Sequence, residues 1–124
     1  MQKEKIILGI DPGTNVMGYG VIKVSNSDIS VLDSGALSMK KEKDLGVRLK
    51  MIFEEMIRII DTHLPDELAI EAQFFGQNVQ SMLKLGKAQG VAIAAALSRS
   101  IPFEEYAPKK IKMSITGKGT SSKE

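Results

Sequence analysis

The order of its expected elements makes this chain an α/β protein, in which helices flank a central mixed sheet of five strands. Two patterns in the sequence predict this class. Five short stretches, most of them apolar, are bounded by turn residues such as Gly, Pro, Asn and Asp, as strands are. Over two longer stretches, apolar residues recur every three or four positions, which is typical of amphipathic helices.

The first three strands are expected to form an antiparallel meander, because only short turns separate them. Pro12 and Gly13 are suited to the first turn, and Asn26, Ser27 and Asp28 to the second. The three strands are placed at residues 5–10, 17–24 and 29–39.

The rest of the chain is expected to alternate helices and strands. The apolar spacing predicts a helix over residues 44–63, which Pro65 brings to an end. The remaining expected elements are short strands at residues 67–72 and 103–107, a helix at residues 77–100, and a third helix opened by Pro108.

The composition indicates one globular domain spanning residues 1–124, with 43% hydrophobic and 26% charged residues. No apolar run reaches the roughly 18 residues of a membrane helix, and no signal peptide is recognisable. We therefore expect a cytoplasmic protein that does not contact a membrane. The chain has no cysteine and a single histidine, His63, so a bound metal ion is expected to have oxygen ligands.

Positive charge gathers at the end of the sequence. Residues 106–124 contain five lysines and one glutamate. Lysines among Gly, Ser and Thr suit contact with phosphates, and a solvated end of the chain is the alternative interpretation. The candidates for phosphate contact are Lys112, Lys118 and Lys123.

Two acids follow apolar runs that should be central strands. Asp11 closes IILGID, and Glu71 lies within ELAIEAQFF. An unpaired carboxylate in such a setting costs several kcal/mol, which a shared divalent cation would relieve. The alternative is that each acid is a strand-end residue facing solvent. Two magnesium ions bound by such acids can activate water for phosphodiester hydrolysis.

Four segments together resemble the RuvC family, the bacterial Holliday-junction resolvases. They are GIDPGTNVMGYGVI, AIEAQFFGQN, SMLKLGKAQGVAIAAA and YAPKKIKMSITGKGTSSK, in the family's order and spacing. The resemblance covers essentially the whole chain. It implies an RNase H-like fold, a homodimer, and magnesium-dependent nicking of two strands at a four-way DNA junction. It implies two Mg²⁺ ions per complete site, with Mn²⁺ as a substitute, and RuvA and RuvB as candidate partners.

The resemblance also implies roles for particular residues. Asp11 and Glu71 match the family's catalytic carboxylates and would bind the metal. Phe74 matches an aromatic residue that contacts an unstacked base, with a hydrophobic loop anchor as the alternative. Lys112 and Lys123 match basic residues placed near the scissile phosphate.

The sequence departs from the family's pattern at three points. Lys118 stands where an apolar residue is usual, so we expect only general electrostatic help from it. Asn15 stands where many relatives have arginine, which leaves a DNA contact from that turn open. Two aspartates of the family's last helix have no counterpart here, so we expect a C-terminally truncated form that binds metal weakly and cleaves poorly or not at all.

The second long helix carries Gly86, Gly90 and Ala94 on one face. Such small residues allow close approach, either to the protein's own sheet or to a second copy across a dimer seam. The resemblance favours the seam, because symmetric nicking needs two related sites.

Three other functions are compatible with parts of the sequence. A YqgF-type nuclease shares the opening GIDxG but generally lacks the LKLGxAxG pattern. An actin-like kinase needs a second phosphate loop and a second domain, which 124 residues cannot hold. A non-catalytic module that binds junctions would keep the carboxylates for structure only.

Overall fold

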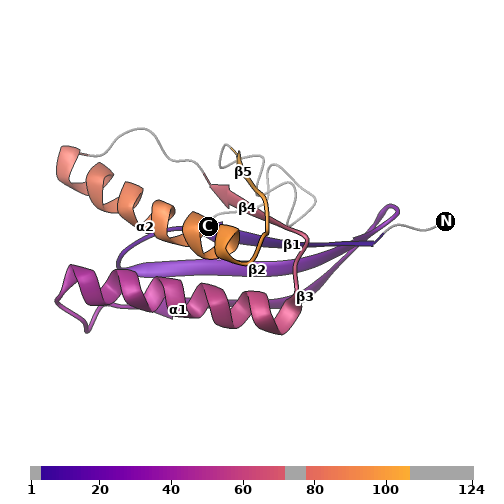
Figure 1. Ribbon diagram of the computed structural model, residues 1–124, viewed down its shortest axis with the longest axis horizontal. Helices are drawn as coiled ribbons and strands as arrows, with labels where there is room; N and C mark the ends of the chain where they lie inside the picture. The colour runs from indigo at the N-terminus through magenta and orange to yellow at the C-terminus, as the bar shows by residue number, and fades with distance from the viewer. Residues whose placement is uncertain (1–3, 72–77, 107–124) are drawn as a thin grey trace, which may run out of the picture.

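The computed structural model describes residues 4–71 and 78–106, which form one sheet and two helices (Figure 1). The elements lie close to their expected positions. In chain order they are β1 (Glu4–Asp11), β2 (Val16–Ser25), β3 (Asp28–Ser38), α1 (Leu45–His63), β4 (Glu67–Glu71), α2 (Val79–Ser98) and β5 (Phe103–Tyr106).

The first three strands form the expected antiparallel meander. β1 pairs with β2 from Glu4 opposite Ser25 to Asp11 opposite Gly18. β2 pairs in turn with β3, and a bulge shifts the register between Val21 and Ile22. Asn26 adopts a left-handed conformation in the second turn, which asparagine tolerates better than most residues.

The sheet has the strand order β3-β2-β1-β4-β5, and it is mixed as predicted. β4 runs parallel to β1, with Ile10 opposite Ile70, and β5 runs parallel to β4. β1 is therefore the central strand. Its apolar side chains Leu8 and Ile10 are fully buried.

Both helices cover the same face of the sheet (Figure 1). α1 contributes Ile52, Met56, Ile59 and Ile60 to the core that lies between them. The fully buried residues of α2 are all alanines, and its partly buried Val91 and Ile93 pack against the same core. The buried alanines are Ala88, Ala92, Ala95 and Ala96.

Both helices are shorter than predicted because polar side chains cap them. Asp44 precedes α1, and its carboxylate accepts a hydrogen bond from the amide of Val47 at 2.9 Å. Asn78 caps α2 in the same way through the amide of Ser81. α2 ends at Ser98, two residues earlier than expected. Ser100 has a φ of 62°, which α-helix geometry excludes.

Some expectations lie outside the described residues. The third helix after Pro108 is one of them, and so are Ala72 and Ala107, the last residues of two expected strands. Within residues 4–71 and 78–106, neither helix has the length and apolar character needed to span a bilayer.

Candidate active site

Asp11 and Glu71 end two neighbouring parallel strands, β1 and β4. The last paired residues before them are Ile10 and Ile70, which both point into the core under the helices. Side chains alternate along a strand, so both acids project to the opposite face of the sheet. Neighbouring strands lie about 4.8 Å apart, so the two acids stand at adjacent strand ends.

The burial of these acids differs from the prediction. Asp11 is exposed and Glu71 is half-buried, whereas we expected both to lie against the core. No charged residue is buried among those that the structure describes. The argument that a cation must offset a large desolvation penalty is therefore wrong. The physical reason is that both acids follow the last core residue of their strand and turn away from the helices.

The space beside Asp11 is open because glycines occupy the facing positions of β2. A Cβ atom on Gly18 would lie 3.8 Å from that of Asp11, and one on Gly20 would meet nothing within 4 Å. On the other side, Tyr106 of β5 is in register with Glu71. Burial raises the pKa of Tyr106 above its usual value, and the charges of Glu104 and Glu67 raise it further. Tyr106 therefore stays a neutral hydrogen-bond donor at the edge of this site.

The helices hold the ends of both acid-bearing strands. Gln89 of α2 donates from Nε2 to the carbonyl oxygen of Glu71 at 3.2 Å. Arg48 of α1 donates from Nη1 to the carbonyl oxygen of Thr14 at 3.1 Å and to Oδ1 of Asn15 at 2.7 Å. The amide of Met39 adds a 2.8 Å bond to the carbonyl oxygen of Asn15. The turn that follows Asp11 is thus fixed from two sides.

Two carboxylates on adjacent strands are hard oxygen donors of the kind that magnesium prefers. Asp11 and Glu71 would supply only two such ligands, and the described part of the chain has no cluster of three or more His, Cys, Asp or Glu. Asp11 and Glu71 fit a divalent cation as two of its ligands. The predicted DNA-contacting residues Phe74, Lys112, Lys118 and Lys123 lie outside the described residues.

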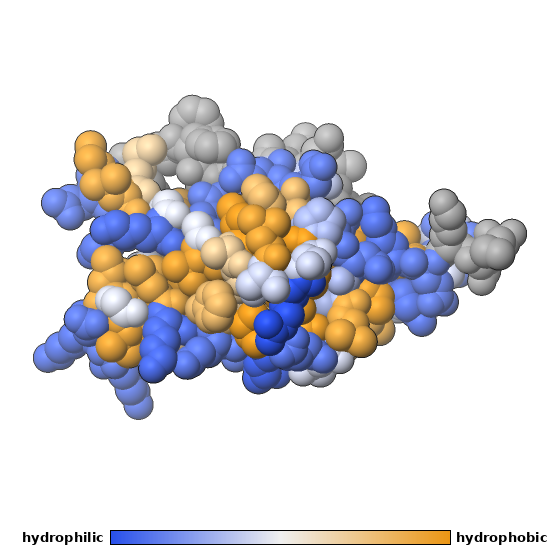
Figure 2. Space-filling model, viewed as in Figure 1, coloured by the Kyte–Doolittle hydropathy of each residue, from blue (hydrophilic) through white to orange (hydrophobic). Residues whose placement is uncertain are grey.

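Gly86, Gly90 and Ala94 are all exposed on α2. Packing against the protein's own sheet, one of the two interpretations, is therefore wrong, because the buried alanines occupy the opposite side of the helix. Large apolar residues share the exposed side, and Figure 2 shows hydrophobic residues gathered along this helix. They include Val79, Leu83 and Leu97, whose exposed fractions are 72%, 59% and 53%.

Sequence reasoning missed the supporting role of Arg48. A signal was present, since this arginine lies one turn from Leu45 and Ile52 on the apolar side of the helix. A charged residue at such a position often reaches a partner on another element. Its acceptors are more than thirty residues away in the sequence, so periodicity could not identify them.

The mixed five-stranded sheet and the two helices on one of its faces define an RNase H-like α/β domain, with two acids at adjacent strand ends. The family model described as crossover junction endodeoxyribonuclease RuvC matches residues 7–124. The chain belongs to the RuvC family. This assignment separates it from the YqgF-type and actin-like alternatives.

Individual relatives agree with this assignment. The chain is 61% identical to RuvC of Christiangramia forsetii over 124 residues and to RuvC of Bacteroides fragilis over 122 residues. It covers 65% of the length of each relative, and these matches take in 100% and 98% of the chain. A solved structure of T. thermophilus RuvC in complex with a Holliday junction substrate superposes with a TM-score of 0.79. The identity to it is 25%, and the match covers 88% of this chain and 68% of that one.

Proposed function

We propose that this protein is part of a metal-dependent endonuclease that nicks four-way DNA junctions. The single observation that carries the proposal is the placement of Asp11 and Glu71 on one face of two adjacent parallel strands, in a chain of the RuvC family. The structural relative bound to a Holliday junction supports the choice of substrate.

In this proposal Asp11 and Glu71 bind Mg²⁺, with Mn²⁺ able to replace it. When bound, the two ions of the complete site would activate a water molecule and stabilise the leaving oxygen. The chain's own contribution is to hold the two carboxylates at a fixed separation. Gln89 and Arg48 do this by fixing the main chain beside each acid.

We further propose that Phe74 stacks on an unpaired base and that Lys112 and Lys123 stabilise charge near the scissile phosphate. Lys118 adds general electrostatic attraction to DNA. RuvA and RuvB are proposed partners, and the cytoplasm, where chromosomal DNA lies, is the proposed location.

The exposed stripe on α2 is proposed as a homodimer seam that brings two sites together. Gly86, Gly90 and Ala94 would let two helices approach closely, and the large apolar residues beside them would be buried. Replacing Gly90 by leucine tests this, because a Cβ there meets nothing within 4 Å and the fold should persist. We expect a shift from dimer to monomer in sedimentation velocity. The control is Glu54→Leu, at an exposed position of α1. An unchanged dimer in the Gly90 variant would rule out this seam.

The catalytic role is tested with Asp11→Asn on a synthetic four-way junction. We use both this chain and a version extended through the family's last helices, and we expect strong cleavage only from the extended version. In that version the substitution should reduce cleavage by about 100-fold or more, while junction binding persists. Asp28→Asn, at an exposed strand end, is the matched control. Full cleavage by the Asp11 variant would support the non-catalytic junction-binding module instead.

A further inference from the structure

A groove of about 590 Å³ opens between the turn after β1 and the N-terminal ends of α1 and α2. One wall of it begins at Gly13, which follows Asp11 by two residues in the sequence. In Figure 1 both helices start on the same side of the molecule, and the groove lies between these starts. Its lining residues are Gly13, Thr14, Asn15, Val16, Lys43, Leu45, Arg48, Ser81, Lys84 and Leu85.

The lining contains three cations and no acid. This is unusual for this part of the chain, since residues 4–71 and 78–106 contain eleven Lys and Arg but fourteen Asp and Glu. Glu42 and Asp44 lie next to Lys43 in the sequence, but their carboxylates accept hydrogen bonds from the amides of Asp44 and Val47. The groove therefore concentrates positive charge in an otherwise acidic region, which favours an anion.

Arg48 has a particular position among the three cations. It is half-buried, and its acceptors are two carbonyl oxygens and the side-chain amide oxygen of Asn15. Within the described residues it forms no ion pair. Neutral acceptors hold the guanidinium in place without cancelling its charge, so Arg48 presents a fixed positive charge to the groove.

We propose that this groove binds backbone phosphates of the DNA strand that leads to Asp11. Lys43 and Lys84, both exposed, contact the phosphates from opposite walls, and Arg48 supplies the fixed charge between them. The proposal rests on the proposed nuclease function and adds a binding subsite to it. Asn15 stands where many relatives have arginine. In this chain Arg48 of α1 donates to Asn15 and so places a positive charge at the same turn.

The test compares the double variant Lys43→Gln/Lys84→Gln with a control pair, Lys23→Gln/Lys50→Gln. The control also removes two partly or fully exposed lysines, but outside the groove. We measure junction affinity against salt concentration by fluorescence anisotropy. Each lost phosphate contact lowers the slope of log K against log salt by about 0.9. The groove variant should therefore lose about 1.8 of slope and bind roughly tenfold more weakly at low salt, while the control changes little.

The outcomes separate the two proposals. If the unmodified protein binds junctions and the groove variant matches the control, the groove proposal is wrong and the nuclease function stands. If the unmodified protein does not bind junctions, both are wrong. A third arm adds inorganic phosphate and follows the amide signals of Gly13 and Val16 by NMR. If the groove variant loses phosphate-induced shifts but keeps full DNA affinity, the groove is a site for free anions and our proposal fails.

Discussion

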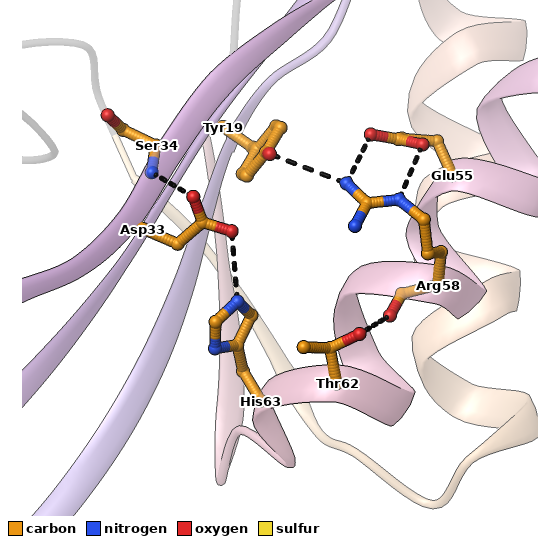
Figure 3. A network of polar contacts seen from close by, with 7 residues as sticks. All are labelled: Tyr19, Asp33, Ser34, Glu55, Arg58, Thr62 and His63. Carbon is orange, nitrogen blue, oxygen red and sulfur yellow. Dashed lines mark hydrogen bonds and ion pairs between the residues drawn. The ribbon is translucent and has the colours of Figure 1, made fainter.

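Two arginines of α1 link this helix to the sheet in opposite ways. Arg48, at the start of the helix, donates only to neutral oxygens and keeps its charge available. Arg58, near its end, forms a two-pronged ion pair with Glu55 at 2.7 and 3.0 Å and also donates to the hydroxyl of Tyr19 (Figure 3). Donation to the Glu55 carboxylate raises the pKa of Arg58 above its usual value. The positive charge of Arg48 is thus not neutralised by an acid, whereas that of Arg58 is. We call the start of α1, with the neighbouring strand ends, the open end of the molecule, and the end of α1 its closed end.

A second pair at the closed end shows the same pattern. His63, the last residue of α1, lies with Nε2 2.9 Å from Oδ2 of Asp33 on β3 (Figure 3). Asp33 also accepts a hydrogen bond from the amide of Ser34. These contacts join helix to sheet far from Asp11 and Glu71. The comparison indicates that the closed end serves stability, while the open end serves binding and chemistry.

The largest expected effect is at the open end. Replacing Glu71 by glutamine in the extended chain should lower junction cleavage by about 100-fold or more, because an amide is a poor ligand for a divalent cation. The free energy of unfolding should hardly change, since Glu71 is not part of the buried core. Glu67→Gln is a close control, on the same strand and face and paired with Lys5 at 3.1 Å. Equal cleavage by the two variants would show that Glu71 does not take part in the reaction.

At the closed end the expected effect falls on stability. A Cβ atom on Gly35 would lie 2.8 Å from the hydroxyl oxygen of Tyr19 and 3.0 Å from its ring, so Gly35→Ala must shift the Tyr19 side chain that contacts Arg58. We expect a loss of about 1–3 kcal/mol in urea unfolding, with cleavage by the folded protein unchanged. Gly20→Ala is the matched control, because its new Cβ meets nothing within 4 Å. Similar unfolding midpoints for the two variants would show that Tyr19 adapts at little cost.

Features that depend on neighbouring residues could be predicted from the sequence, and features that depend on contacts between distant residues could not. The strands and helices of residues 4–71 and 78–106 were predicted to within one or two residues, because their positions depend on local periodicity and on Gly and Pro. The sequence singled out Asp11 and Glu71 as strand-end acids, but it did not predict that their strands are parallel neighbours, because pairing depends on the whole sheet. The exposure of the two acids could not be predicted, since it depends on which face of the sheet the two helices cover. The contacts of Arg48 and Arg58 were missed because long side chains choose partners that only the folded chain brings near.

A smaller effect is expected just beyond α1. Leu64 follows the helix with a φ of 50°, a left-handed conformation that strains residues other than glycine, and its exposed fraction is 72%. Leu64→Gly should therefore stabilise the protein by about 0.5–1 kcal/mol, because it relieves strain and gives up little burial. Thermal unfolding measures this. Leu83→Gly is the contrasting variant, since glycine inside α2 should destabilise the protein by about 1 kcal/mol.

The smallest effect concerns acid stability at the closed end. The hydrogen bond from His63 lowers the pKa of Asp33 below its usual 3.8. A carboxyl group with a lowered pKa stabilises the folded state above its usual pKa, and this contribution disappears as the pH falls through the lowered value. Asp33→Asn should therefore be less stable than the unmodified protein at pH 6, and this difference should shrink below about pH 4. Melting curves at several pH values measure it, with Asp28→Asn at the start of the same strand as control. A difference that stays constant down to pH 2.5 would show that Asp33 contributes through its shape and not through its charge.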